Sequence, residues 1–359
     1  MPPQGDHSNP CPVYNRKGTS VQILNRKRFT KVLIAVMVTT VTLAIAITAL
    51  SGALTTRKSV QVIPKEVFLV THDSFVMDKS LVADFNKTTG FQLKLLKAGD
   101  AGSLTNRLIL TKGTPIADAV FGIDNTFAGL ATSNGLIDGP LKAIDFGDVC
   151  FNYDKLWFAN HKIAPPISVK QLIDPTYKGL TVIENPNTSS TGLSFLAASV
   201  EIFGESGWQS YWKSLKKNGV KVSSGWEDAY FVAFSGSSGK GAYPIVLSYA
   251  SSPAYEVRAN GQSQTTSIMD GCFRQTEYAG ALKNAKNPLG AAAVVKYLLS
   301  SKFQSSLPEA MYMYPIVKDT PLPEKWKKFA TLATRTYGDT LNIDANRKSR
   351  LTQWTAIFN

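Results

Sequence analysis

The chain has 359 residues, of which 44% are hydrophobic and 18% are charged. This predicts one large or two medium globular domains and excludes a wholly disordered chain. The net charge of +13 raises nucleic acid or an anionic membrane as a partner, but much of the excess lies near the N-terminus without an aromatic-basic recognition motif, so we expect no nucleic-acid binding.

The N-terminal part of the chain has the pattern of a membrane-targeting segment. Residues 1–31 are polar and basic, and we expect a disordered cytoplasmic tail there. The uncharged stretch 32–54 would be about 34 Å long as a helix, at ~1.5 Å per residue, which is enough to cross a bilayer. It is either an uncleaved transmembrane anchor or a secretory signal cut after Ala53, and its length favours the anchor. Basic residues before it predict that the remainder lies outside the cytoplasm.

After a linker at 55–65, apolar strands and amphipathic helices alternate along the chain. This alternation is typical of α/β domains with parallel sheets. In a first block, strands are predicted in 66–75, 91–99 and 117–125, with helices in 77–90, 103–110 and 126–137. In a second block, strands are predicted in 178–186, 220–226, 242–255 and 273–282, with helices in 190–204, 207–219 and 288–308.

The two blocks predict two lobes joined by extended segments near 146–152 and 270–278. We expect lobe 1 to comprise 66–149 and 273–320, lobe 2 to comprise 150–272, and a helical segment to follow at 321–359. In open α/β sheets, ligands bind beyond the carboxyl ends of the strands. The polar and aromatic residues that follow the predicted strands are therefore candidates for a binding site.

These candidates suit an organic cation. Trp226, Tyr249 and Tyr255 are aromatic, whereas Asp73, Asp100 and Asp124 are anionic, and aromatic faces with carboxylates attract cations. Tyr312 adds a further aromatic ring. Ser189 and Ser190 lie near a predicted helix N-terminus, where they either hold a polar ligand group or act as helix caps. Singly, each aromatic residue is more often a core residue than a ligand contact, so the prediction depends on their joint placement.

Catalysis and metal binding lack the residues that they need. The chain has three histidines and three cysteines, and none forms a metal-binding motif. Only His72 is placed to act as a base, and no nucleophile motif accompanies it. We therefore expect that the protein is not an enzyme and has no cofactor and no metal site. A hydrolase or transferase on a similar fold remains an alternative.

Several segments resemble the thiamine-binding members of the extracytoplasmic solute-binding proteins of ABC importers. The most specific are "GWEDAYFVAF", "VLSYASSPAYE" and "MYMYP", and the resemblance covers about residues 66 to 355. It implies a bilobal, periplasmic-binding-protein-like α/β fold that closes over its ligand. It also implies thiamine, and with less certainty its phosphate esters, as the ligand, and a permease and an ATPase subunit as partners of a monomer.

The resemblance further implies roles for individual residues. Tyr255 would stack on a ring of thiamine, with Tyr249 and Trp226 lining the cleft, and Asp100 would pair with the polar or cationic part of the ligand. The set is completed by residues that would contact the ligand from both lobes or close the far wall, namely His72, Asp73, Asp124, Ser189, Ser190 and Tyr312. The family pattern has a tyrosine in place of His72 and a tryptophan in place of Tyr312.

Cys150 and Cys272 each lie in one of the two segments that cross between the predicted lobes. Crossing strands in proteins of this kind often run side by side, so we predict a disulfide that braces the hinge, with two buried thiols as the alternative. Other solutes, namely ferric ion, a polyamine or a phosphonate, remain alternative ligands. The six-residue spacing of Tyr249 and Tyr255 argues against iron. An anchored adhesin without a small ligand is a further alternative.

Overall fold

The computed structural model describes residues 64–237, 241–338 and 343–359. The predicted tail, the segment 32–54 and almost all of the linker 55–65 lie outside these residues. No helix within the described ranges is long and apolar enough to cross a membrane.

The strands of the described residues form one mixed sheet. Its order is β2-β1-β3-β8-β4-β7-β5-β6, and β9 pairs with β4 off this path. Short runs such as those of β3 and β7 are buried along their whole length, as expected for strands covered on both faces. The strand bounds are β1 Glu66–Thr71, β2 Gln92–Lys97, β3 Ala119–Asp124, β4 Ile137–Asp154, β5 Thr181–Glu184, β6 Lys221–Ser223, β7 Ile245–Tyr249, β8 Thr265–Leu282 and β9 Tyr314–Pro315.

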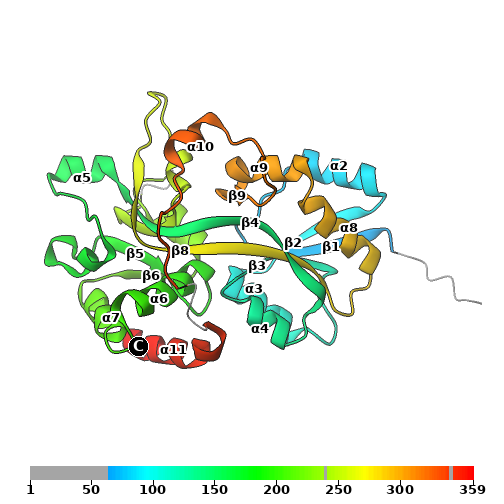
Figure 1. Ribbon diagram of the computed structural model, residues 1–359, viewed down its shortest axis with the longest axis horizontal. Coiled ribbons are helices and arrows are strands. Elements are labelled where there is room, and N and C mark those ends of the chain that lie inside the picture. Colours follow the sequence, from blue (N-terminus) through cyan, green and yellow to red (C-terminus); the bar gives the residue numbers. More distant parts are fainter. Residues whose placement is uncertain (1–63, 238–240, 339–342) are drawn as a thin grey trace, which may run out of the picture. The chain divides into compact units, whose positions relative to one another are not determined.

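Two long antiparallel strands, β4 and β8, run side by side through the middle of the sheet (Figure 1). On one flank lie β2, β1 and β3, which pair in parallel with one another and are called here the β1 side. On the other flank lie β7, β5 and β6, also parallel, called here the β5 side. The parallel pairing predicted from the strand–helix alternation is confirmed within each side, and the central pair is antiparallel.

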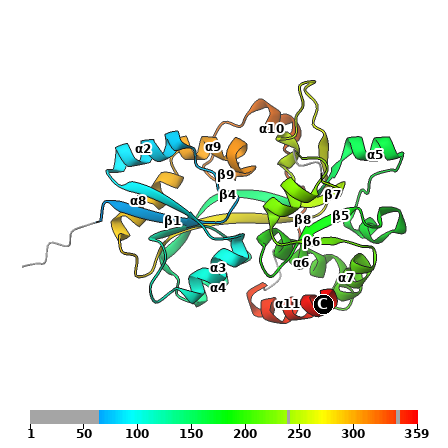
Figure 2. The same ribbon diagram turned by 180° about the vertical axis from the view of Figure 1, so that it is seen from behind.

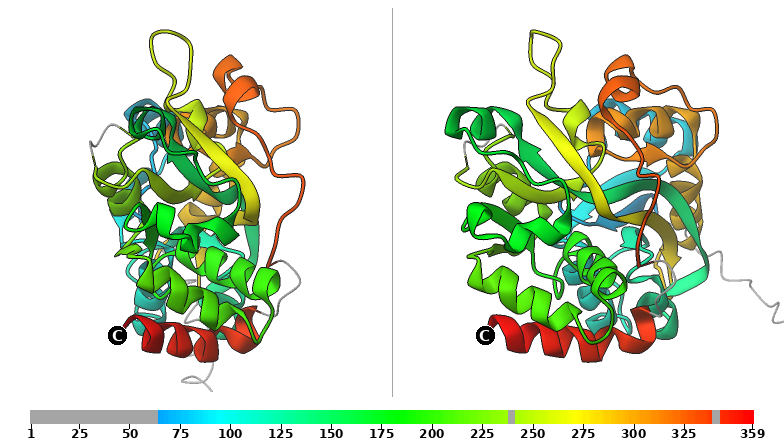
Figure 3. Two further views of the ribbon diagram at one scale, coloured as in Figure 1. Left: turned by 90° about the vertical axis from the view of Figure 1, so that its left-hand side faces the viewer. Right: turned by 60° about the vertical axis from the view of Figure 1, so that its left-hand side comes forward.

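Helices cover both faces of the sheet, and α11 lies against α7 beneath the β5 side (Figures 2 and 3). The segment 288–308 was predicted as one helix, but two are found, because Ser300 caps a new helix by accepting a hydrogen bond from the Phe303 amide. The helix bounds are α2 Lys79–Thr89, α3 Ala101–Leu110, α4 Ala128–Ser133, α5 Lys155–His161, α6 Ser190–Phe203, α7 Trp208–Lys217, α8 Pro288–Leu298, α9 Ser301–Met311, α10 Glu324–Phe329 and α11 Ile343–Phe358.

A disulfide joins the two central strands. Cys150 of β4 and Cys272 of β8 are bonded, with their Cα atoms 4.5 Å apart and a separation of 122 positions in sequence. The β4–β8 register shifts between Val149 and Phe151, next to this bond. The bond therefore links the strands at a point where the regular ladder of backbone hydrogen bonds is interrupted.

Removing this bond should destabilise the protein. The double variant Cys150→Ala/Cys272→Ala is expected to lose about 2–5 kcal/mol of unfolding free energy, because a long loop in the unfolded chain is no longer constrained. Intact-mass measurement of wild type before and after reduction should show a gain of two hydrogens. Alkylation of both cysteines in unreduced, denatured protein would contradict the disulfide.

Candidate functional site

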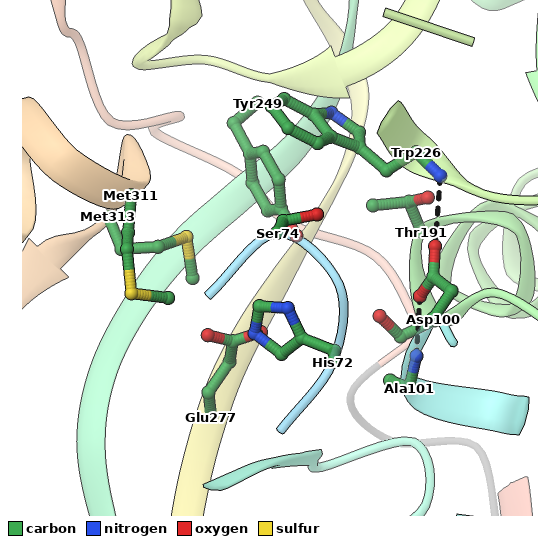
Figure 4. A pocket seen from close by; sticks show the side chains of 11 residues that line it. His72, Ser74, Asp100, Ala101, Thr191, Trp226, Tyr249, Glu277, Met311 and Met313 are labelled. Carbon is green, nitrogen blue, oxygen red and sulfur yellow. Dashed lines mark hydrogen bonds and ion pairs between the residues drawn. The ribbon is translucent and has the colours of Figure 1, made fainter. Parts of the chain in front are cut away.

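A cavity of about 20 Å³ lies between the β1 side and the β5 side, with β8 forming its floor. Figure 4 shows how the side chains converge on it from both sides. Its volume is sufficient for about one water molecule, and it is far below the ~300 Å³ of a typical small-molecule site. The lining residues are His72, Ser74, Asp100, Ala101, Ser190, Thr191, Trp226, Tyr249, Glu277, Met311 and Met313.

The lining residues come from strand ends and helix starts, as the sequence predicts for an open α/β sheet. His72 directly follows β1, and Tyr249 is the last residue of β7. Asp100 caps the N-terminus of α3, and Ser190 begins α6. Trp226 begins the short helical segment that follows β6. The structure therefore brings together five of the predicted site residues around one cavity.

Trp226 is held in a fixed orientation on the β5 side. Its indole Nε1 donates a hydrogen bond to Ser248 Oγ at 2.9 Å, and its ring stacks on Tyr230 with centroids 5.0 Å apart. Tyr249 lies beside it at 6.1 Å between ring centroids, and both side chains are buried. Two aromatic rings are thus presented to the cavity without conformational freedom to lose on binding.

His72 lies on the β1 side against a glycine. Gly122 of β3 has a φ of 97°, and a Cβ atom there would lie 2.1 Å from the imidazole Cδ2. The absence of a side chain at this position allows the imidazole to pack against the backbone of β3, with the Phe121 ring 5.5 Å away. The His72 Nε2 atom faces Glu277, with 3.4 Å between it and Oε1.

Hydrogen bonds connect the two sides across the cavity. Asp100 of the β1 side accepts from the Trp226 amide of the β5 side at 2.9 Å and also from the Ala101 amide at 2.6 Å. The amides of Gly102 and Ser103 donate to the Thr188 carbonyl at 3.1 and 3.2 Å. The N-terminus of α3 is therefore joined to the loop before α6, and the two sides are in contact.

An open groove of about 480 Å³ adjoins the cavity and shares Ser74, Asp100 and Trp226 with it. The predicted site residue Asp73 lines this groove rather than the cavity. Its Oδ1 accepts from the Gly99 amide at 3.0 Å, which holds the turn after β1 against the turn before α3. Asp73 therefore lies at the entrance to the cavity.

The other predicted residues lie near the cavity but do not line it. Asp124 and Ser189 are fully buried behind it. Tyr312 has a φ of 62° at the end of α9, so that its ring packs at 5.6 Å from Trp226 while Met311 and Met313 reach the cavity. The Tyr255 ring packs against that of Tyr312 with centroids 4.4 Å apart, and Tyr255 remains 48% exposed.

Several lining residues were not predicted from the sequence. Glu277 is the most consequential, because it places a carboxylate on the cavity floor with 4% of its surface exposed. An acidic residue inside the predicted strand 273–282 was the available signal. Thr191 also lines the cavity, and its hydroxyl donates to Glu184 Oε2 at 2.8 Å. Ser74 and the two methionines carried no signal that distinguishes them from turn or core residues.

Buried carboxyl groups surround the cavity, and burial shifts their pKa values. Burial raises the pKa of Asp100, although its two backbone hydrogen bonds oppose the shift. Burial also raises the pKa of Glu184 well above its ordinary value, and raises the pKa of Asp124 to about 7, with the Glu277 charge adding to the latter shift. The Tyr249 pKa is raised by burial and by the same carboxyl groups. Among the described residues, however, no group of His, Cys, Asp and Glu side chains is arranged to hold a metal ion.

Comparison with known proteins identifies the class. Residues 122–334 match the family model of the bacterial extracellular solute-binding proteins, and the chain belongs to this family. The fold is accordingly the α/β periplasmic-binding-protein fold. A solved structure titled "Periplasmic thiamin binding protein" superposes with a TM-score of 0.70 at 25% identity, covering 82% of this chain and 96% of that chain.

Individual proteins of known name are similar to this chain over most of its length. The thiamine-binding periplasmic protein of Escherichia coli is 29% identical over 311 residues, which is 79% of this chain and 90% of the relative. The thiamine-binding periplasmic protein of Brucella melitensis is 28% identical over 315 residues, covering 80% and 90%. The resemblance to the thiamine-binding members of the family is thus confirmed over most of the chain, and the relatives are binding proteins rather than enzymes.

The Asp124 carboxyl should make stability depend on pH. Because its pKa rises from 3.8 to about 7 on folding, its stabilising contribution is complete below pH 3.8 and is lost as the pH rises to about 7. Between about pH 5 and pH 8 the variant Asp124→Asn is expected to lose about 2–3 kcal/mol less unfolding free energy than wild type. Chemical denaturation at the two pH values measures this difference. Equal pH dependence of the unfolding free energy in the two proteins would contradict the raised pKa of Asp124.

Proposed function

We propose that this protein is the extracytoplasmic receptor for thiamine of an ABC importer, and that it passes the vitamin to a permease driven by an ATPase subunit. The observation that carries the proposal is the convergence of two fixed aromatic rings, Trp226 and Tyr249, with carboxylates on one cavity. Thiamine combines a flat aminopyrimidine with a permanently cationic thiazolium ring. Aromatic faces contribute about 0.5–2 kcal/mol each to holding such a cation.

The size of the cavity supports binding with a change between an open and a closed form. About 20 Å³ cannot admit thiamine, whereas the adjoining groove of about 480 Å³ leads to the same residues. We infer that the β1 and β5 sides belong to two lobes that separate to admit the ligand, with β4 and β8 as the connecting strands. The bonds from Trp226 to Asp100 and from α3 to Thr188 would then break on opening.

The placement of the tyrosines favours an organic ligand over ferric ion. Tyr249 is buried at the cavity, whereas Tyr255 is half exposed and faces Tyr312 rather than Tyr249. The two phenol groups therefore do not converge as a pair of metal ligands would. Tyr255 instead extends the aromatic cluster of Tyr312 and Trp226 toward the surface.

Purified full-length protein should bind thiamine as a monomer, because the receptor site lies within one chain. Isothermal titration calorimetry with thiamine, thiamine phosphate, spermidine and ferric citrate compares the candidate ligands directly. We expect tight, saturable binding of thiamine and a loss of about tenfold to 100-fold in affinity in Trp226→Ala, because a desolvated ring contact with a cation is removed. Binding of ferric citrate or spermidine in preference to thiamine would refute the proposal.

We also propose that residues 32–54 tether the receptor to the outer face of the cell membrane. The support is the uncharged length of this segment and the basic residues before it. The protein should remain in the membrane fraction after alkaline carbonate extraction, and its intact mass should correspond to the uncleaved chain. A soluble product that begins near residue 54 would instead identify the segment as a cleaved signal.

A further inference from the structure

Three carboxyl groups form a row across the sheet beneath the cavity. In the register of the strands, Glu277 of β8 is the partner of Asp124 on β3 and also of Asp145 on β4. Directly paired residues point to the same face of a sheet, so the three side chains are neighbours. All three are buried, with 0% of Asp124, 4% of Glu277 and 0% of Asp145 exposed. The pairing of like charges in the interior is unfavourable unless protons or a bound cation compensate it.

The row has unused hydrogen-bonding capacity. Within the part of the chain that the structure describes, no hydrogen-bond partner is found for Glu277 Oε2, for Asp124 Oδ2 or for either carboxyl oxygen of Asp145. Buried polar atoms are nearly always paired in folded proteins. Unpaired acceptors beside a cavity therefore indicate that bound protons, or at Glu277 the ligand, complete the row.

Glu277 is the member of the row that faces the cavity. It lines the cavity wall together with His72, and Figure 4 shows its carboxyl group directed toward the imidazole. Asp145 and Asp124 do not line the cavity. Burial and the neighbouring Glu277 carboxyl group raise the pKa of Asp145 well above its ordinary value.

Asp100, the other carboxyl group at the cavity, already has partners for both oxygens. Its Oδ1 accepts from the Ala101 amide and its Oδ2 from the Trp226 amide. These bonds cap α3 and join the two sides of the cavity. Asp100 therefore joins the two sides in this arrangement, whereas Glu277 lines the cavity beside His72 and accepts at Oε1 from the Gln275 side-chain amide.

We propose that Glu277 is the counter-ion that the site offers to the positive charge of its ligand, and that His72 competes with the ligand for this one carboxylate. This inference rests on the proposed binding of a cation such as thiamine. Asp145 acts as a positioning residue, because its protonated carboxyl group lies beside Glu277 without adding a second charge. When the ligand is bound, its positive charge would lie next to Glu277. Without ligand, a protonated His72 imidazole would supply the positive charge there.

The charges around His72 explain the competition. Carboxyl groups act on it from three elements, namely Glu277 on β8, Asp100 at α3 and Asp73 after β1, whereas the β3 residues packed against it are uncharged. Burial alone would lower the His72 pKa, but these carboxyl groups outweigh burial and raise it. On acidification the imidazole becomes a cation next to Glu277, where it both neutralises the carboxylate and repels a cationic ligand.

The first experiment removes the charge of Glu277 and compares two ligands by calorimetry on full-length protein. One ligand is thiamine, and the other is a neutral analogue in which an uncharged aromatic ring replaces the thiazolium. Glu277→Gln should weaken thiamine binding by about 30-fold to 100-fold and the neutral analogue by less than about threefold. Glu66→Gln, the same change at an exposed position on β1, is the matched control and should affect neither ligand.

Comparing the two ligands distinguishes an error in the proposed function from an error in the role of Glu277. If wild type binds neither ligand, the proposed function itself is wrong. If wild type binds thiamine and Glu277→Gln weakens both ligands equally, Glu277 has only a structural role and the present inference is overturned. A loss in Asp145→Asn as large as that in Glu277→Gln would place the charge on Asp145 and would also overturn it, and circular dichroism of each variant establishes that it is folded.

The second experiment tests the competition through the pH profile of thiamine affinity. Between about pH 8 and pH 5.5, wild type should lose about tenfold in affinity, and His72→Phe, which keeps a ring against Gly122 but cannot be protonated, should lose less than about threefold. Titration of thiamine itself affects both proteins equally and cancels in their ratio. Parallel profiles for wild type and His72→Phe would exclude the role of His72.

Discussion

The antiparallel pairing of β4 with β8 is the constraint on which the site depends. The register of this pair places Asp145 beside Glu277, and the same two strands carry the cysteines of the disulfide. A shift by one residue would turn Glu277 to the opposite face of the sheet and remove the carboxylate from the cavity floor. The backbone hydrogen bonds between β4 and β8 and the disulfide thus together hold Glu277 in the interior, where a charge is unfavourable.

The buried position of Glu277 also affects the stability of the ligand-free protein. A buried carboxylate without a full set of partners destabilises the ligand-free protein, and a bound cation relieves that cost. The backbone contacts between α3 and the loop before α6 are few and lie at the rim, so they can separate without disrupting either side of the sheet. In the proposed function, closure over a cation would combine aromatic contact from Trp226 and Tyr249 with neutralisation of the Glu277 carboxylate.

The sequence predicted those parts of the site that depend on local pattern. His72, Asp100, Trp226 and Tyr249 lie at or just after the ends of predicted strands, and polar or aromatic residues at such ends converge in an open α/β sheet. Glu277 could not be found in this way, because its position depends on the register between strands that are far apart in sequence. The direction of Tyr312 was equally inaccessible, since it depends on the left-handed backbone conformation at the end of α9.

The most direct test of this account is the crystal structure of the protein with thiamine bound. The account predicts that the ligand lies between the two sides of the sheet, with its rings against Trp226 and Tyr249 and its positive charge directed toward Glu277. A ligand that occupies only the outer groove, or that lies in the cleft with its cationic ring directed away from the carboxyl row, would contradict it.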